Sequence, residues 1–239
     1  RDLHTRVRRQ RQMCIRDSFI HFCGINVTKK ASTYLVKNGV LSKSLLKTKY
    51  INVIKQLLDH NSEIDFTSQK IQRSFIRILQ LVRKFTRDLK QELNDLESGL
   101  YVSVYQSAGK SIRRIGKVDA DYESKDFIPS SVFHLPETIN RVIKFIRKVK
   151  NGRAYIVIDA IRNPYEAKFF KDRYAAFHLV SINAPDEHRT RYLQKLHKFS
   201  AEQIKKIDDE ESGKGESEYK HLTNPNVKKC IEISDIHLF

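Results

Sequence analysis

Residues that could bind phosphate or a divalent cation lie close together in one stretch, IVIDAIRNPYE, at positions 156–166. Asp159 directly follows an apolar run, and Arg162 comes three positions later, just before an Asn-Pro pair that is typical of a helix start. A carboxylate in this place can hold Mg²⁺ or a water molecule, and a guanidinium can bind a phosphate through two hydrogen bonds. The same side chains would also suit a structural ion pair between a strand and a helix, so the pattern leaves both roles open.

The glycine-rich loop that cradles nucleotide phosphates has the form G-x-x-x-x-G-K-[ST], and two segments of the chain match it in part. The first match, GINVTKKA at positions 24–31, keeps Gly24 and Lys30. Lys29 replaces the second glycine, where a Cβ would crowd the phosphate, and Ala31 replaces the residue whose hydroxyl binds Mg²⁺. We therefore expect a degenerate loop whose phosphate binding is weakened.

The second match, GKS at positions 109–111, keeps the end of the motif, but Val104 stands where the first glycine belongs. Order along the chain favours the first match, because it follows an apolar run at 19–24 that predicts the first strand of the fold. In that interpretation Lys110, Arg113 and Arg114 form a basic loop that faces the substrate.

The elements that must position these residues are clearest in the second half of the chain. Apolar runs, helix caps and turn signals predict helices and strands in alternation, with short links. The predicted helices cover 136–149, 163 onward and 184–199, the strands cover 154–158, 177–182 and 230–236, and an acidic loop covers 208–218. The run AYIVI at 154–158 is typical of a strand buried on both faces. This order predicts an α/β fold with a parallel sheet and crossover helices.

The first half of the chain is dominated by one long amphipathic pattern. Apolar residues recur in steps of three and four over about 68–97 and predict a single helix, within a helical insertion at about 60–98. Short apolar runs at 19–24 and 101–104 predict strands. We expect one domain over 19–239.

Two further arginines, Arg189 and Arg191, stand on the predicted helix at 184–199. Arginines after a strand of a nucleotide-binding sheet can close over phosphates and stabilise the charge that develops during transfer. A solvated helix face would hold the same residues, so a structural role stays open beside the functional one.

Composition narrows the classes of protein and partner. The chain has 239 residues and a formal net charge of +17, which excludes an acidic disordered protein and favours partners that carry phosphate. No apolar run is long enough for a membrane span. Three scattered cysteines, at positions 14, 23 and 230, exclude a disulfide framework and indicate a reducing, cytoplasmic location.

Four segments together resemble a known family. They are AGKSIRRIG at 108–116, IDAIRNPYEAKFFKDRY at 158–174, AFHLVSINAPDEHRTRYLQ at 176–194 and VKKCIEISDIHLF at 227–239. In this order they resemble the N-terminal P-loop nucleotide-kinase-like domain of deoxycytidylate deaminase family proteins, including the anti-phage dCTP deaminases. The resemblance covers residues 100–239 well and 19–60 poorly. It implies a P-loop-like sheet, and a parent hydrolase that converts a deoxycytidine nucleotide to its uridine form in nucleotide metabolism or antiviral defence.

Zinc-dependent deamination needs the motifs H-x-E and P-C-x-x-C, because zinc activates a water molecule and the glutamate moves its proton. The sequence contains neither H-x-E nor C-x-x-C. By the resemblance, zinc would belong only to a deaminase domain that follows residue 239. At the other end, residues 1–18 are expected to be non-native, since RQRQMCIRDS resembles a translated sequencing adapter.

These observations predict a domain that binds ATP or a deoxynucleotide, with Mg²⁺ as cofactor and Asp159 as its ligand. The predicted nucleotide- and phosphate-binding residues are Gly24, Lys30, Arg113, Arg114, Asp159, Arg162, Arg189 and Arg191. One alternative is an active phosphotransferase similar to nucleoside-monophosphate or dephospho-coenzyme A kinases. Another is a basic nucleic-acid-binding module, which predicts one contiguous positive face. No membrane partner is expected, and self-association is left open.

Overall fold

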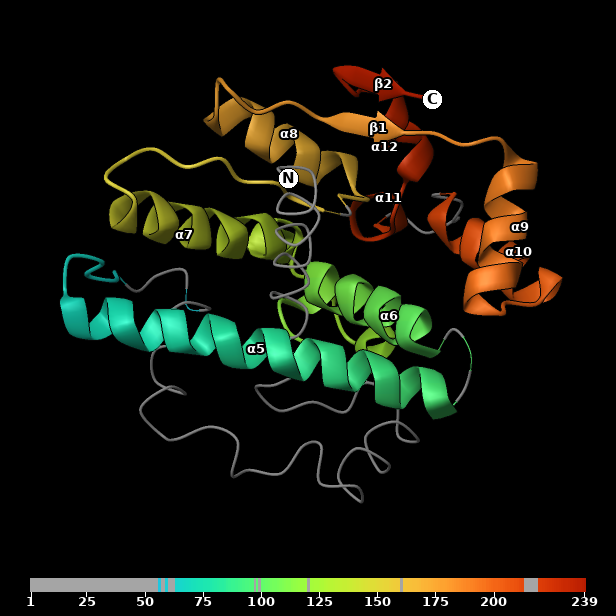
Figure 1. Ribbon diagram of the computed structural model, residues 1–239, viewed down its shortest axis with the longest axis horizontal. Helices are drawn as coiled ribbons and strands as arrows, with labels where there is room; N and C mark the ends of the chain where they lie inside the picture. Colours follow the sequence, from blue (N-terminus) through green and yellow to red (C-terminus); the bar gives the residue numbers. More distant parts are fainter. Residues whose placement is uncertain are drawn as a thin grey trace.

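The computed structural model describes residues 56, 59, 63–96, 98, 100–119, 121–159, 161–212 and 219–239. The strand predicted at 19–24 and the first P-loop match, with Gly24 and Lys30, lie outside the described residues. Figure 1 shows the described helices and strands in chain order. They are α5 (Gln69–Leu96), α6 (Leu100–Ile115), η2 (Tyr122–Ser124), η3 (Pro129–Phe133), α7 (His134–Val149), α8 (Pro164–Arg173), β1 (Val180–Ile182), α9 (Asp186–His197), α10 (Ala201–Glu211), α11 (Lys220–Thr223), α12 (Val227–Glu232) and β2 (Ile236–Leu238).

The two strands form a parallel pair, as the order of elements predicts. Val180 lies opposite Ile236 and Ile182 opposite Leu238, and helices α9 to α12 connect the two strands. The last strand begins later than the predicted 230–236, because the side chain of Asn226 accepts a hydrogen bond from the Lys229 backbone and starts helix α12. The described part of the chain is therefore helix-rich α/β with a small parallel sheet.

The segment 154–158 is not a strand: it has no regular secondary structure and belongs to no sheet among the described residues. Ile156 and Ile158 pack against the apolar cluster of α7 and α8, whereas Tyr155 is 99% exposed and Val157 55% exposed. Successive side chains of an extended segment point to opposite sides, and the helices cover only one of them. The prediction that both faces are buried is wrong.

The long helix is confirmed within one or two residues, as α5. Its apolar stripe buries Phe75, Ile78 and Leu93, and the Phe75 ring lies 4.0 Å from the ring of Phe145 on α7, centroid to centroid. In Figure 1 α5 extends along α6 and α7, so the stripe is covered by these two helices. The helix owes its position to this packing.

The strand predicted at 101–104 is helical and begins α6. Val104, Ala108 and Ile112 are buried at intervals of four residues, the spacing of one helix face. The aromatic residues that suggest a strand are accommodated in the helix, since the rings of Tyr101 and Tyr105 pack against each other one turn apart, tilted by 40° with centroids 4.3 Å apart. Tertiary packing has overridden local strand propensity here.

Candidate functional site

The turn that carries Arg162 is fixed by the residue after it. Asn163 is fully buried, and its side-chain oxygen accepts a hydrogen bond from the Tyr165 backbone N–H at 2.9 Å, which confirms the predicted start of helix α8. Its amide group donates to the carbonyl oxygens of Leu222 and Asn224 at 2.9 and 3.1 Å. The turn is therefore attached to the segment around α11, and the Arg162 carbonyl also accepts a hydrogen bond from the Asn226 N–H over 2.7 Å.

Arg162 is paired with a residue far along the chain. Its Nη1 donates to Oε1 of Glu211, at the end of α10, over 2.5 Å, and Nε2 of Gln106 donates to the same oxygen over 3.1 Å. The Arg162 side chain remains 37% exposed. Asp159 is exposed and is not the partner of Arg162 among the described residues. The structural ion pair of Arg162 is therefore formed with Glu211 and not with Asp159.

Arg189 also forms an ion pair with α10, one turn before Glu211. Its Nη2 donates to Oδ2 of Asp208 on α10, and the Arg189 side chain is also 37% exposed. Residues three apart on a helix lie on one face, with about 5–6 Å between their Cβ atoms. Asp208 and Glu211 thus bind two arginines from two different elements at neighbouring positions of one helix face. We refer to Arg162, Arg189, Asp208 and Glu211 as the α10 cluster.

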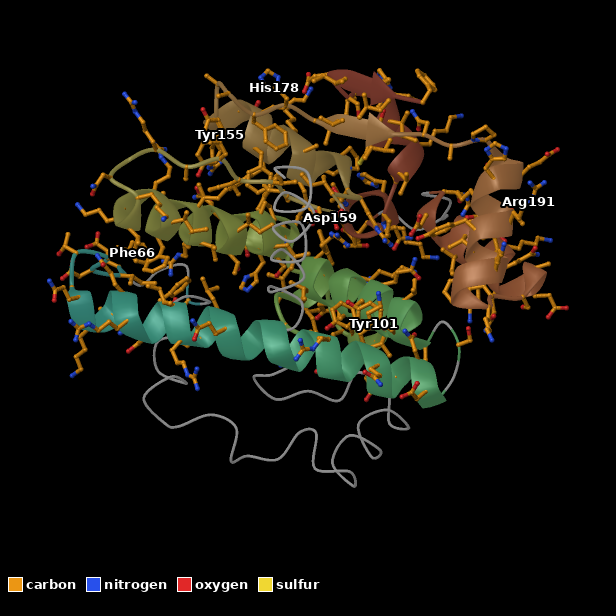
Figure 2. All side chains as sticks on the ribbon, viewed as in Figure 1. Phe66, Tyr101, Tyr155, Asp159, His178 and Arg191 are labelled. Atoms are coloured by element: carbon orange, nitrogen blue, oxygen red, sulfur yellow. The ribbon has the colours of Figure 1, made fainter. Side chains whose placement is uncertain are left out.

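Arg191 does not join the α10 cluster. It follows Arg189 by two residues on α9, and positions two apart on a helix do not face the same way. Arg191 is exposed, and Figure 2 shows it on the outer side of α9, whereas Asp159 lies in the middle of the view, above α6. The two arginines that sequence spacing groups together are separated by helix geometry.

Arg113 is buried rather than directed toward a substrate. Its Nε donates to Oε1 of Glu166 over 2.9 Å, and its Nη1 donates to the carbonyl of Thr223 over 3.4 Å. Both members of the ion pair are less than 10% exposed. The pair connects α6 with α8 and α11, and a contact with phosphate would require Arg113 to leave Glu166.

Arg114 binds a different segment from Arg113. Its guanidinium donates to the carbonyl oxygen of Lys125 from Nε and Nη2, over 3.1 and 2.9 Å, and to that of Glu123 over 3.3 Å. These bonds hold the turn around η2 against the end of α6. The basic loop predicted around Lys110, Arg113 and Arg114 is a regular helix, which is a correction to the sequence interpretation.

The second P-loop match is excluded by the same helix. Gly109 lies inside α6, where a Cβ would stand 3.2 Å from Nη1 of Arg113, so glycine leaves room for the buried guanidinium. Ser111 is buried, and its hydroxyl donates to the Lys117 carbonyl and accepts from the Asp119 N–H. A phosphate cradle needs free backbone N–H groups ahead of a helix, and these residues are in mid-helix.

The carboxylates of the α10 cluster, Asp208 and Glu211, were not among the site residues that the sequence predicts. Residues 208–211 were expected to begin an acidic loop, but they form the last turn of α10. The signal was present: Ser200 and Gln203 form a capping box, in which each side chain bonds to the other residue's backbone N–H. A helix that starts at residue 201 reaches 211 over three turns.

The thiol of Cys230 is buried. Burial raises the pKa of the Cys230 thiol to about 12, and the nearby Glu166 carboxylate adds to this effect. The thiol therefore keeps its proton at neutral pH and is a poor nucleophile. No group of three or more His, Cys, Asp or Glu side chains that could hold a metal occurs among the described residues. Within the same residues, no helix is both long and apolar enough to span a membrane.

Searches against protein-family models, curated proteins and solved structures found no match to this chain.

Proposed function

We propose that the chain is a P-loop-like nucleotide-binding domain and that the α10 cluster receives the phosphate tail of a nucleotide. The observation that carries the proposal is the convergence of Arg162 and Arg189 on one face of α10, through Glu211 and Asp208. Two guanidinium groups from separate elements can bind one polyphosphate at several oxygens, with the bidentate geometry that arginine favours.

The carboxylates stand in for phosphate when no nucleotide is bound. Both ion pairs are partly exposed, with arginine side chains 37% exposed in each. Ion pairs of this kind contribute only about 0–1 kcal/mol, so exchanging a carboxylate for a phosphate of higher charge costs little. A nucleotide would release Glu211 and Asp208 and take their places on the two arginines.

Asp159 supplies the remaining part of the proposed site. It is exposed at the carboxyl end of the extended segment 154–158, and α8 begins five residues later. The sequence interpretation relies on the rule that ligands bind beyond the carboxyl ends of parallel strands. Because 154–158 pairs with no strand among the described residues, the proposal rests instead on the exposure of Asp159 and on its place three residues before Arg162. Asp159 would hold the Mg²⁺ ion that accompanies ATP or a deoxynucleotide triphosphate.

The resemblance supplies the wider context of the proposal. Two of its four segments, 158–174 and 176–194, contain Arg162 and Arg189 respectively. We infer that the domain is part of a protein of the deoxycytidylate deaminase family. Both dCTP and ATP are therefore ligands to test. Because the GKS segment is part of α6, binding without phosphotransfer is the simpler role for this domain.

The decisive measurement is the affinity of the whole chain for fluorescent ATP and dCTP analogues in the presence of Mg²⁺. Arg162→Ala and Arg189→Ala should each weaken binding about tenfold or more, the effect of about 1.5–3 kcal/mol for a hydrogen bond to a charged group. Arg153→Ala removes an equal charge from an exposed position outside the cluster and should leave the affinity unchanged. Equal affinities for all variants, or no binding by the parent chain, would refute the proposal.

A further inference from the structure

Helix α5 carries a second basic feature, independent of the α10 cluster. Residues 69–87 include six lysines and arginines and no aspartate or glutamate. Lys70, Arg73, Arg77 and Arg87 are exposed. At 100° per residue these positions fall on one side of the helix, opposite the buried stripe of Phe75 and Ile78. From 70 to 87 the face extends over about 25 Å, at a rise of 1.5 Å per residue.

The arrangement of charge along α5 works against the stability of the helix. A helix favours acidic residues in its first turn and basic residues in its last, because of its macrodipole. Helix α5 has no acidic residue in the first turn and no basic residue in the last. Lys70 and Arg73, and likewise Arg73 and Arg77, also stand at spacings where like charges repel.

Solvated helices normally interleave both signs of charge so that neighbouring side chains pair. On this face Arg77 instead donates to the neutral side chain of Gln80, over 3.3 Å. The basic side chains of this face repel one another and oppose the helix dipole. A partner of high negative charge would explain why they are placed in one row.

We propose that the outward face of α5, defined by Lys70, Arg73, Arg77 and Arg87, binds the sugar–phosphate backbone of a nucleic acid without reading its bases. A duplex carries one negative charge per 1.7 Å of its axis, so it offers phosphates along the whole of a cationic face about 25 Å long. A membrane fits less well, because an interfacial helix must insert its apolar face, and α5 has buried that face against α6 and α7.

A protein partner also fits less well. Stable protein interfaces have an apolar, desolvated centre with charge at the rim. Among the large apolar residues of α5 whose exposure the structure describes, only Ile76 is substantially exposed, at 43%. The face is cationic from Lys70 to Arg87, and the acidic residues of α5 all follow this stretch towards the end of the helix. Binding to a nucleic-acid backbone is the mode of recognition that uses such a surface.

The test uses the whole chain and fluorescently labelled 24-nucleotide probes: duplex DNA, duplex RNA and single-stranded RNA. Binding is measured by anisotropy between 50 and 200 mM salt. The variant K70E/R73E/R77E should lose at least a hundredfold in affinity. Replacing the same three residues by glutamine should lower the slope of log affinity against log salt by about 3, since each phosphate contact contributes about one unit.

The control variant K144E/K195E/K228E makes the same change in net charge at exposed positions on α7, α9 and α12. It should keep most of the affinity. Charge-preserving exchange of Lys70, Arg73 and Arg77 between lysine and arginine should also keep it. The glutamate variant is expected to fold, because all three positions are exposed and Lys70 lies in the first turn of α5, where an acidic residue is favourable. Circular dichroism checks this.

Three outcomes would overturn the proposal. Equal losses in the α5 variant and the control would mean that net charge alone attracts the probe. Binding that does not change with salt would exclude contacts to phosphates. Preferential binding to phosphatidylserine vesicles over all three nucleic acids, with loss in the α5 variant, would assign the face to membranes instead.

Discussion

Arg162 and Glu211 stand 49 positions apart and form an ion pair with 2.5 Å between Nη1 and Oε1. The pair joins the turn before α8 to the last turn of α10, and Gln106 of α6 binds the same carboxylate oxygen. One glutamate thus holds three elements together. It also occupies the guanidinium that we propose for a phosphate, so under that proposal it would compete with the ligand.

Replacement of Glu211 by glutamine tests this competition. The neutral amide binds Arg162 less strongly than the carboxylate, so a phosphate displaces it more easily. We expect Glu211→Gln to increase the affinity for ATP or dCTP about threefold to tenfold. Titration of the whole chain with a fluorescent nucleotide measures the effect. Weaker binding in this variant would show that Glu211 serves only to hold Arg162 in place.

The buried pair of Arg113 and Glu166 should dominate the stability of the segment between α6 and α8. Removing one partner leaves an unpaired charge in the interior, which costs about 3–5 kcal/mol. We therefore expect Glu166→Gln to lower the free energy of unfolding by an amount close to this range, as measured in urea. Replacement of both residues by apolar side chains of similar volume should recover much of the loss. A cost below about 1 kcal/mol, the value for exposed pairs, would contradict the buried pairing.

Cys230 should make stability fall at alkaline pH. In the folded chain the pKa of its thiol is raised from 9.0 to about 12, so between these values the unfolded chain has lost a proton that the folded chain keeps. Since stability falls with pH wherever the folded state binds more protons, the thiol's contribution is lost progressively above pH 9. Cys230→Ser should flatten the decrease between pH 9 and 11.

Alkylation gives an independent measurement of the same thiol. Iodoacetamide at pH 8 should modify the peptide that contains Cys230 only after denaturant is added, because the reactive form is the thiolate. Mass spectrometry separates this peptide from those of the other cysteines. Rapid modification of Cys230 in the folded chain would show that the thiol is accessible.

Local signals in the sequence were sufficient for elements that stabilise themselves. Asn163 and Pro164 mark the start of α8, because an N-cap side chain and a fixed proline φ act within one turn. The long apolar stripe predicts α5 because its period repeats over seven turns. The parallel pairing of β1 and β2 follows from the alternation of strands with crossover helices.

The partner of each charged side chain could not be predicted in this way. The sequence places Arg113 and Arg114 next to each other and Asp159 three positions from Arg162, and it is silent on which of these groups meet. Arg113 pairs with Glu166 after 53 positions, and Arg162 with Glu211 after 49. Such pairs form only when separate helices pack, so their choice depends on the whole arrangement.

The sequence by itself determined which segments have a helical or extended period, where α8 begins, and that the chain is strongly cationic. Tertiary structure alone decided which face of 154–158 is covered, that 100–115 is one helix, and which arginines remain partly exposed. The physical reason is the distance along the chain over which each interaction acts. Caps and periodicity act over a few residues, whereas burial and ion pairing depend on groups that folding brings together from distant positions.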